Sequence, residues 1–188
     1  MSTYHHGNLP KAILASAGKI LEKEGLTGLS LRHAARRAGV SHNAPYRHFP
    51  HRESLLAGLA AQGFAMLGEA LNNCSGKAMG AAYVRFALRY PERFRLMFGG
   101  SLPIEKYPVL REAAQRAFQP VVDSFRPHAS PQQAQIAAAA AWSLVHGLSH
   151  LLLDGHFKQA SSEAGGTEQL VRQVLDTVRY VLGAQRSA

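Results

Sequence analysis

The sequence lacks the features that secreted, membrane-spanning and redox-active proteins depend on. Cys74 is the only cysteine in 188 residues, so no disulfide can form within the chain, as is usual in the reducing cytosol. The chain shows no basic-then-apolar leader and no unbroken apolar run of membrane-spanning length. We therefore expect a soluble, cytoplasmic protein with no membrane partner.

Signatures of common catalytic sites are also missing. The sequence holds no phosphate-binding loop, no nucleophile elbow and no dinucleotide-binding fingerprint. Cys74 lies in a polar, turn-rich segment without a base nearby in sequence, which disfavours a nucleophilic role. We therefore predict that the protein is not an enzyme and uses no cofactor.

Acidic residues are scarce relative to basic ones. Twelve Asp and Glu stand against 21 Lys and Arg, which gives a formal net charge of +9. Residues 1–54 hold eight Lys and Arg against three Glu, a net charge of +5, and six of the ten histidines. Basic density near the N-terminus is typical of a surface that binds DNA, although a basic surface also serves solubility.

Apolar residues recur at helical spacing along the chain, without strand alternation or internal repeats, so we predict an all-α fold. We expect helices over about residues 9–25, 51–72, 79–90, 92–98, 107–125, 132–153 and 168–182. Pro120 should kink its helix, and residues 156–167 should form a loop. The helix over 132–153 is apolar nearly all round between Ile136 and Val145, so it should be buried on several sides.

Residues 30–49 read as two short helices joined by a tight turn, the pattern of a helix-turn-helix. Ser30 is a good N-cap, and Gly39 provides the permissive backbone that a helix C-terminus favours. Val40 should pack between the two helices, and Ser41 should cap the second. The alternative is a helical hairpin with a polar, solvated face.

The motifs Leu29-Ser-Leu-Arg, Ala-Arg-Arg-Ala-Gly-Val-Ser and Tyr46-Arg-His-Phe, followed by Glu53-Ser-Leu-Leu, resemble the DNA-binding domain of the tetracycline-repressor (TetR) family of transcriptional regulators. The resemblance runs from about residue 4 to residue 59. It implies a three-helix DNA-binding domain over residues 1–53 and a helical ligand-binding and dimerisation domain over residues 54–188. It also implies a ligand-responsive regulator, a repressor that is released from a palindromic operator by a small molecule.

Arg47 is the first choice for reading bases, because arginine pairs bidentately with guanine in the major groove. His42 and Asn43 start the same helix, where base contacts are usual. The resemblance implies further contacts, mostly with phosphates, and the full predicted DNA-binding set is Thr27, Ser30, His42, Asn43, Ala44, Tyr46, Arg47, His48 and Arg52. Pro45 departs from the family pattern and biases Ala44 away from helix, so this helix should start late or tight.

The motif Ala44-Pro-Tyr-Arg-His-Phe resembles one branch of the family, whose ligand domain carries a Trp…His-Gly signature, present here as Trp142, His146 and Gly147. Aromatic, sulphur-bearing and polar side chains should line the effector pocket. The predicted ligand-binding set is Phe86, Met97, Phe98, Tyr107, Phe118, Trp142 and His146. Because few acids are placed to meet a cation, we expect a largely apolar, neutral or weakly anionic ligand.

The last predicted helix carries a clean apolar stripe, formed by Val171, Val174, Leu175, Val178, Val181 and Leu182. Such a stripe needs a partner surface. In TetR-like proteins the last two helices pair with the same two helices of a second chain. We therefore expect a homodimer through these helices.

Two alternatives stay open. His146, His150 and Asp154 follow one another at four-residue spacing on one helix face, as zinc ligands would, although no Glu follows the first histidine. They would suit a metal-binding bundle or an enzyme. The other alternative is a DNA-binding protein without an effector, whose second domain only dimerises. The pattern does not separate repression from activation.

Overall fold

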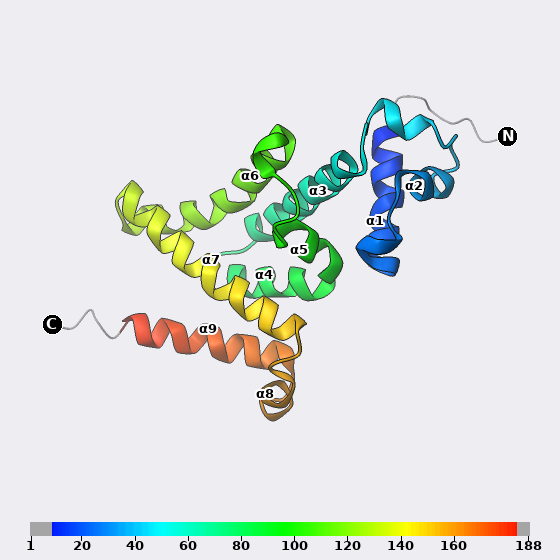
Figure 1. Ribbon diagram of the computed structural model, residues 1–188. Coiled ribbons are helices and arrows are strands. Elements are labelled where there is room, and N and C mark those ends of the chain that lie inside the picture. The colour runs from blue at the N-terminus through cyan, green and yellow to red at the C-terminus, as the bar shows by residue number, and fades with distance from the viewer. Residues whose placement is uncertain (1–8, 184–188) are drawn as a thin grey trace. The chain divides into compact units, whose positions relative to one another are not determined.

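The computed structural model describes the backbone of residues 9–183 and the side chains of residues 9–177, and this range is helical with no strand (Figure 1). The all-α prediction is therefore confirmed. The distal stripe residues Val178, Val181 and Leu182 lie outside the described side chains.

The α-helices are α1 (Leu9–Gly28), α2 (Leu31–Arg37), α3 (Arg52–Asn72), α4 (Lys77–Arg89), α5 (Pro91–Phe98), α6 (Pro108–Phe125), α7 (Pro131–Leu153), α8 (Lys158–Glu163) and α9 (Thr167–Gly183). Three short 3-10 helices, η2 (Ala44–Arg47), η3 (Ile104–Lys106) and η4 (Arg126–His128), lie between them.

Helix boundaries follow the capping residues of the sequence. The Ser30 hydroxyl oxygen accepts the backbone N–H of His33 at 3.1 Å and so begins α2. Ser130 and Gln133 form a reciprocal capping box at the start of α7. Gly25 adopts a φ of 69° and interrupts the helical geometry of α1, at the position where the first helix is predicted to end.

Two local predictions are wrong. The predicted loop over residues 156–167 contains the short helix α8, in which Lys, Gln, Ala and Glu are all good helix formers. The second half of the helix-turn-helix forms only the four-residue 3-10 helix η2, which begins at Ala44. Pro120 lies inside α6, which continues past it to Phe125.

Close packing divides the chain into two compact units. Unit 1 comprises the chain up to Ala65 together with Tyr90–Gln115, and unit 2 comprises Met66–Arg89 together with the chain from Arg116 onward. Packing thus groups α5 and the start of α6 with the N-terminal helices. The predicted functional boundary between residues 53 and 54 stays a prediction.

In unit 1, α1 packs against α2 and α5. The fully buried side chains of this unit include Ile13, Ile20, Leu21, Leu55, Leu59 and Phe94. Arg93 of α5 is buried among these helices, where its Nε atom lies 3.3 Å from the Glu22 carboxylate of α1. Glycine at 18 leaves room for it, since a Cβ atom there would lie 2.5 Å from the guanidinium.

In unit 2, α4 packs against α7 and α9. Tyr83, Val84, Val122 and Ala138 are buried in its core. Lys77 of α4 pairs with Asp176 of α9, and Arg85 approaches Glu168 at 3.7 Å, so charges of opposite sign join the same two helices.

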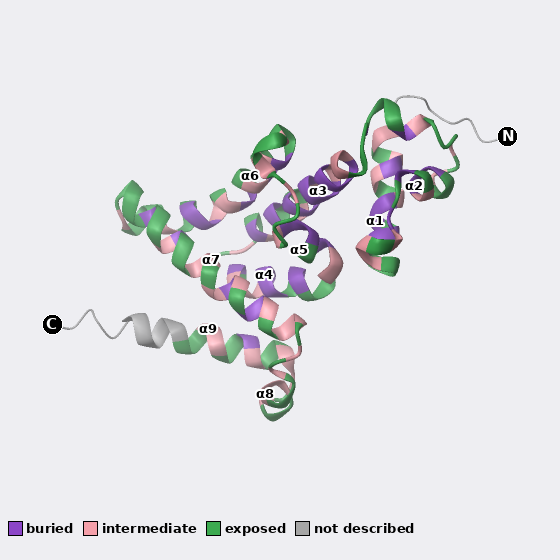
Figure 2. Ribbon diagram, in the orientation of Figure 1, coloured by how far each residue is buried: buried purple, intermediate pink, exposed green. Residues whose placement is uncertain are grey.

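Much of α7 is exposed in the single chain (Figure 2), so its predicted burial on several sides is not provided by this chain alone and stays a prediction. Ile136 is 64% exposed, and Ala139, Ala140 and Leu151 are exposed as well. The apolar residues of α7 do not reveal, from sequence alone, whether the same chain or another chain covers them.

By length and composition, α3 and α7 are apolar enough to cross a membrane, although polar residues interrupt both. In α3, 61% of the apolar segment is buried inside the protein, as in the core helix of a soluble domain, whereas in α7 only 22% is buried.

Candidate functional site

The first part of the candidate DNA-binding surface is α2 and the turn that ends it. The Gly39 N–H donates to Arg36 O at 3.2 Å and the Val40 N–H donates to Ala35 O at 3.1 Å. Gly39 has a φ of 70°, which favours glycine. These bonds form a Schellman motif, so the chain leaves α2 in a defined direction.

The second part is the segment that would enter a DNA groove. The Asn43 N–H approaches Ser41 Oγ at 3.4 Å, and η2 follows from Ala44. Pro45 and Phe49 are buried, and the Phe49 N–H donates to Pro45 O at 2.8 Å. Burial of these two residues leaves the side chains between them on the outside.

The structure leaves most of the predicted DNA-binding residues exposed. The exposed ones are Thr27, Ser30, His42, Asn43, Tyr46, Arg47, His48 and Arg52, whereas Ala44 is half-buried. His42 and Asn43 belong to a turn rather than to a helix, as the early proline led us to expect. Contact with DNA stays a prediction for every one of these residues.

Arg52 has an internal role that sequence reasoning missed. Its Nε atom donates to Leu29 O at 2.9 Å, and its Nη2 atom donates to Leu26 O. Leu26 lies near the end of α1 and Leu29 in the connection to α2, and no local sequence signal points to partners 26 and 23 residues away. Arg52 therefore holds the connection from which the helix-turn-helix starts.

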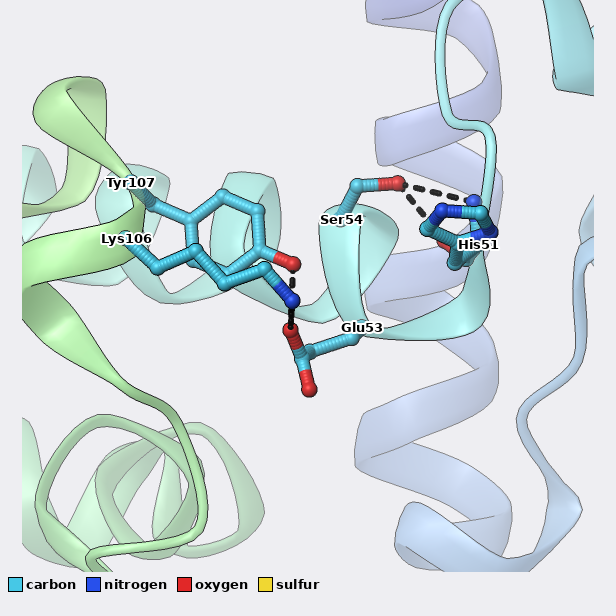
Figure 3. Close-up of polar contacts among 5 residues, drawn as sticks. All are labelled: His51, Glu53, Ser54, Lys106 and Tyr107. Atoms are coloured by element: carbon cyan, nitrogen blue, oxygen red, sulfur yellow. Dashed lines mark hydrogen bonds and ion pairs between the residues drawn. The ribbon is translucent and has the colours of Figure 1, made fainter.

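The start of α3 is fixed by two sets of contacts (Figure 3). The His51 N–H donates to Ser54 Oγ at 3.2 Å, and the Ser54 hydroxyl donates back to His51 O. Glu53 accepts hydrogen bonds from Lys106 Nζ at 2.7 Å and from the Tyr107 hydroxyl at 2.5 Å. These two bonds lower the pKa of the Glu53 carboxyl, so it stays ionised.

In unit 2 a polar and aromatic cluster surrounds Tyr83. The Tyr83 hydroxyl lies 2.9 Å from His146 Nδ1, and the Tyr83 ring meets Trp142 edge-on at 5.1 Å between centroids. Phe118 meets the other side of Trp142 at the same distance. We call Tyr83, Phe118, Trp142 and His146 the Tyr83 cluster.

Burial perturbs the titratable members of the cluster. It lowers the pKa of His146 from its ordinary 6.5, and the neighbouring His150, with ring centroids 4.7 Å apart, adds to this shift. Burial also raises the pKa of the Tyr83 hydroxyl, which stays protonated. Tyr83 and His146 therefore form a neutral hydrogen-bonding pair beside the aromatic rings of Phe118 and Trp142.

The predicted ligand-binding residues are divided between the two units. Phe86, Phe118, Trp142 and His146 belong to unit 2, whereas Met97, Phe98 and Tyr107 belong to unit 1. The Tyr107 hydroxyl is engaged by Glu53, and Phe98 packs edge-on against Phe64 at 5.2 Å. That all seven residues line one ligand pocket stays a prediction.

The zinc alternative finds no support in the described residues, where no three His, Cys, Asp or Glu side chains gather as a metal site requires. Asp154 is the exposed C-cap residue of α7, and His146 Nδ1 faces the Tyr83 hydroxyl.

An exposed, basic helix-turn-helix joined to a helical second part defines a DNA-binding regulator. Comparison with known families agrees: the model of the tetR family of bacterial regulatory proteins matches residues 13–59, and that of the tetracyclin repressor-like C-terminal domain matches residues 77–178. The chain therefore belongs to the TetR family of transcriptional regulators.

Solved structures share the fold of this chain. A protein of unknown function from Rhodococcus sp. RHA1 is 34% identical, with 94% of this chain and 96% of that chain covered and a TM-score of 0.76. A possible TetR family transcriptional regulator from Streptomyces coelicolor A3(2) is 18% identical, with coverages of 92% and 99% and a TM-score of 0.61.

A TetR variant from Acinetobacter baumannii AYE, solved in complex with minocycline, is 21% identical, with coverages of 94% and 97% and a TM-score of 0.61. At that identity the likeness concerns the fold alone. A search of functionally curated proteins found no match.

The role of Arg52 predicts a stability difference between two exposed arginines. Arg52→Ala should lower the free energy of unfolding by about 1 kcal/mol, because two hydrogen bonds to backbone carbonyls are lost. Arg47→Ala should change it by less than about 0.5 kcal/mol. Urea denaturation measures both, and equal effects would contradict the role given to Arg52.

The neutral state of His146 predicts a pH dependence of stability. Because its pKa is lowered in the folded protein, the unfolded chain binds the proton first, and the free energy of unfolding should fall as the pH drops below about 6.5. His146→Asn should flatten this fall, whereas His128→Asn on an exposed histidine should not. Denaturation series at several pH values test this, and an unchanged slope in His146→Asn would refute it.

Proposed function

We propose that the protein is a homodimeric, cytoplasmic repressor that binds a palindromic operator and releases it when a small molecule binds the second part of the chain. The observation that carries the proposal is the surface around η2, where polar and basic side chains are exposed between the buried Pro45 and Phe49. Activation in place of repression is the alternative, which a reporter under the operator separates.

On this proposal the exposed residues in and near η2 contact DNA in two ways. Arg47 reads a guanine, with His42 and Asn43 beside it in the turn. Tyr46, His48, Thr27 and Ser30 contact the phosphate backbone and fix the register on the duplex. Ser30 already accepts a hydrogen bond from His33, so its hydroxyl proton remains the group to offer to a phosphate oxygen.

The exposed face of α7 supports dimerisation. Ile136, Ala140, Ser143, Gly147 and Leu151 recur at helical spacing, and all five are exposed. A Cβ atom at Gly147 would meet nothing within 4 Å, so a second chain could approach the backbone there. We propose that this face pairs with its copy about a two-fold axis together with α9, apart from Val171 of the α9 stripe, which is buried within its own chain.

The Tyr83 cluster supports an effector site. It offers aromatic surface with one neutral hydroxyl–imidazole pair, the composition that suits a largely apolar, uncharged or weakly anionic ligand. Minocycline and imidazole are bound by two proteins of the same fold. We propose that Trp142, His146 and Gly147 mark the branch of the family that carries a Trp…His-Gly signature.

Release of DNA requires that the effector bind the DNA-incompetent state more tightly than the competent one. α3 begins beside the DNA-binding residues at Arg52 and runs without a break into unit 2. Glu53, with its bonds to Lys106 and Tyr107, lies at the start of this helix, so a shift of α3 would strain these bonds.

DNA binding predicts both a salt effect and a specificity effect. The logarithm of the affinity should fall linearly with the logarithm of salt concentration, with a slope of about −0.9 per phosphate contact.

Arg47→Ala should cost about 1–3 kcal/mol on the best site and relax preference at one base pair per half-site. Binding measured by fluorescence anisotropy tests both effects. If Arg47→Ala kept full discrimination between DNA sequences, Arg47 would contact the phosphate backbone of DNA and not a base.

The dimer predicts different outcomes for two exposed apolar positions. Ile136→Asp should yield monomers, because each new carboxylate would face the same apolar patch on the partner. Val109→Asp, at a residue that is 66% exposed on α6, should leave the dimer intact. Light scattering with circular dichroism distinguishes dissociation from unfolding, and an intact Ile136→Asp dimer would place the interface elsewhere.

The effector site predicts a fluorescence signal, since Trp142 is the sole tryptophan. A compound that releases DNA should change Trp142 emission over the same concentration range. Phe118→Leu, next to Trp142, should weaken both responses together. Release of DNA with silent Trp142 emission, and with an intact response in Trp142→Phe, would move the pocket away from the Tyr83 cluster.

A further inference from the structure

A second hollow lies between α4 and α9, within unit 2 and apart from the Tyr83 cluster. It encloses about 420 Å³, within the range of small-molecule sites. Val84, Leu88 and Val171 supply its apolar lining, and Arg85, Arg89 and Arg172 supply its basic groups. We call this hollow the α4–α9 groove.

The groove uses the side of α4 that faces away from the Tyr83 cluster. In a helix of 3.6 residues per turn, Arg85 and Leu88 project from the side opposite to Tyr83. Tyr83 is buried, whereas Leu88 is 37% exposed although it is a large apolar residue. A ligand in the groove would therefore not compete for the groups that we assign to the effector.

The charges around the groove are unbalanced. Glu168 is the one acid in its lining, and it approaches Arg85 at 3.7 Å, too far for a hydrogen bond. Arg89 and Arg172 have no side-chain hydrogen bond or ion pair within the described residues. At the other end of the same helix pair, Lys77 is matched by Asp176. The imbalance attracts an anion.

An apolar extension adjoins the basic end. A smaller hollow of about 310 Å³ shares Leu88 and Thr167 with the groove and is lined by Leu152, Phe157 and Lys158. The two hollows together offer apolar lining beside the arginines, and Lys158 adds one more cation. This combination suits a molecule with an apolar body and an acidic head.

We propose that the α4–α9 groove binds an amphipathic anion, an acyl chain that ends in a carboxylate, with the carboxylate on Arg89 and Arg172 and the chain over Leu88 toward Leu152 and Phe157. Arginine suits this task because its planar guanidinium pairs with carboxylates bidentately. The site is separate from the proposed effector site and does not depend on it.

Isothermal titration of the full-length protein with decanoate, below its micelle concentration, tests the proposal. Decanoate should bind with one site per chain, and decanol and decyltrimethylammonium, which share its chain but not its charge, should bind at least about tenfold more weakly. Arg89→Gln/Arg172→Gln should lower decanoate affinity by at least about tenfold. These two arginines are chosen because removing Arg85 would leave Glu168 without its neighbouring cation, whereas no acidic residue of the lining is paired with Arg89 or Arg172.

The control is Arg32→Gln/Arg116→Gln, which removes the same charge from exposed arginines elsewhere and should leave decanoate binding unchanged. Leu88→Glu should abolish binding while leaving the helical circular dichroism and the affinity of the purified protein for DNA unchanged. This preserved DNA binding separates failure of the groove from failure of the proposed regulator.

Three results would overturn the proposal. These are the absence of decanoate binding, equal loss of affinity in the paired arginine variants and their control, and equal affinity for decanoate and decanol. Conversion to monomers by Leu88→Glu, seen by light scattering, would also overturn it, because the groove would then be covered by a second copy of the chain.

Discussion

The buried guanidinium of Arg93 is the constraint on which the arrangement of unit 1 depends. It contacts Glu22 of α1 and the Leu59 carbonyl of α3 from its own position on α5. A charge that is removed from water must be paired, so these contacts tie the three helices in one register. Glycine at 18 and 63 provides the space, since a Cβ atom at either position would lie within 3.0 Å of the Arg93 side chain. Partial burial raises the pKa of Glu22 while Arg93 opposes that rise, so the buried guanidinium of Arg93 is paired with a carboxylate that still reaches solvent.

The same unit positions its candidate DNA-binding surface through backbone contacts. The Schellman motif after α2, the buried Pro45 and Phe49, and the Arg52 bonds to Leu26 and Leu29 each fix one part of residues 26–52. Because these contacts use backbone carbonyls and apolar side chains, they leave the polar side chains around η2 available for a partner. A short 3-10 helix can serve as a recognition element only if its surroundings are rigid, and these contacts supply that rigidity.

Local chemistry made much of the fold predictable. Ser30, Gly39 and Ser130 mark helix ends through capping bonds between near neighbours, and Pro91 marks the break between α4 and α5. Contacts over long sequence separation were not predictable. No pattern joins Arg52 to Leu29, Glu53 to Lys106 and Tyr107, or Tyr83 to His146. The apolar composition of α7 is visible in the sequence, but a single sequence does not say whether the same chain covers it, and the single chain leaves much of it exposed.

The account rests on sequence-specific recognition of DNA by the surface around η2. The most direct measurement is selection of bound sequences from random duplex DNA with the purified full-length protein, followed by sequencing of the enriched pool. The account predicts enrichment of an inverted repeat, because two copies related by a two-fold axis present the same surface to two half-sites. A pool without an enriched sequence, or enrichment of a single half-site, would contradict it.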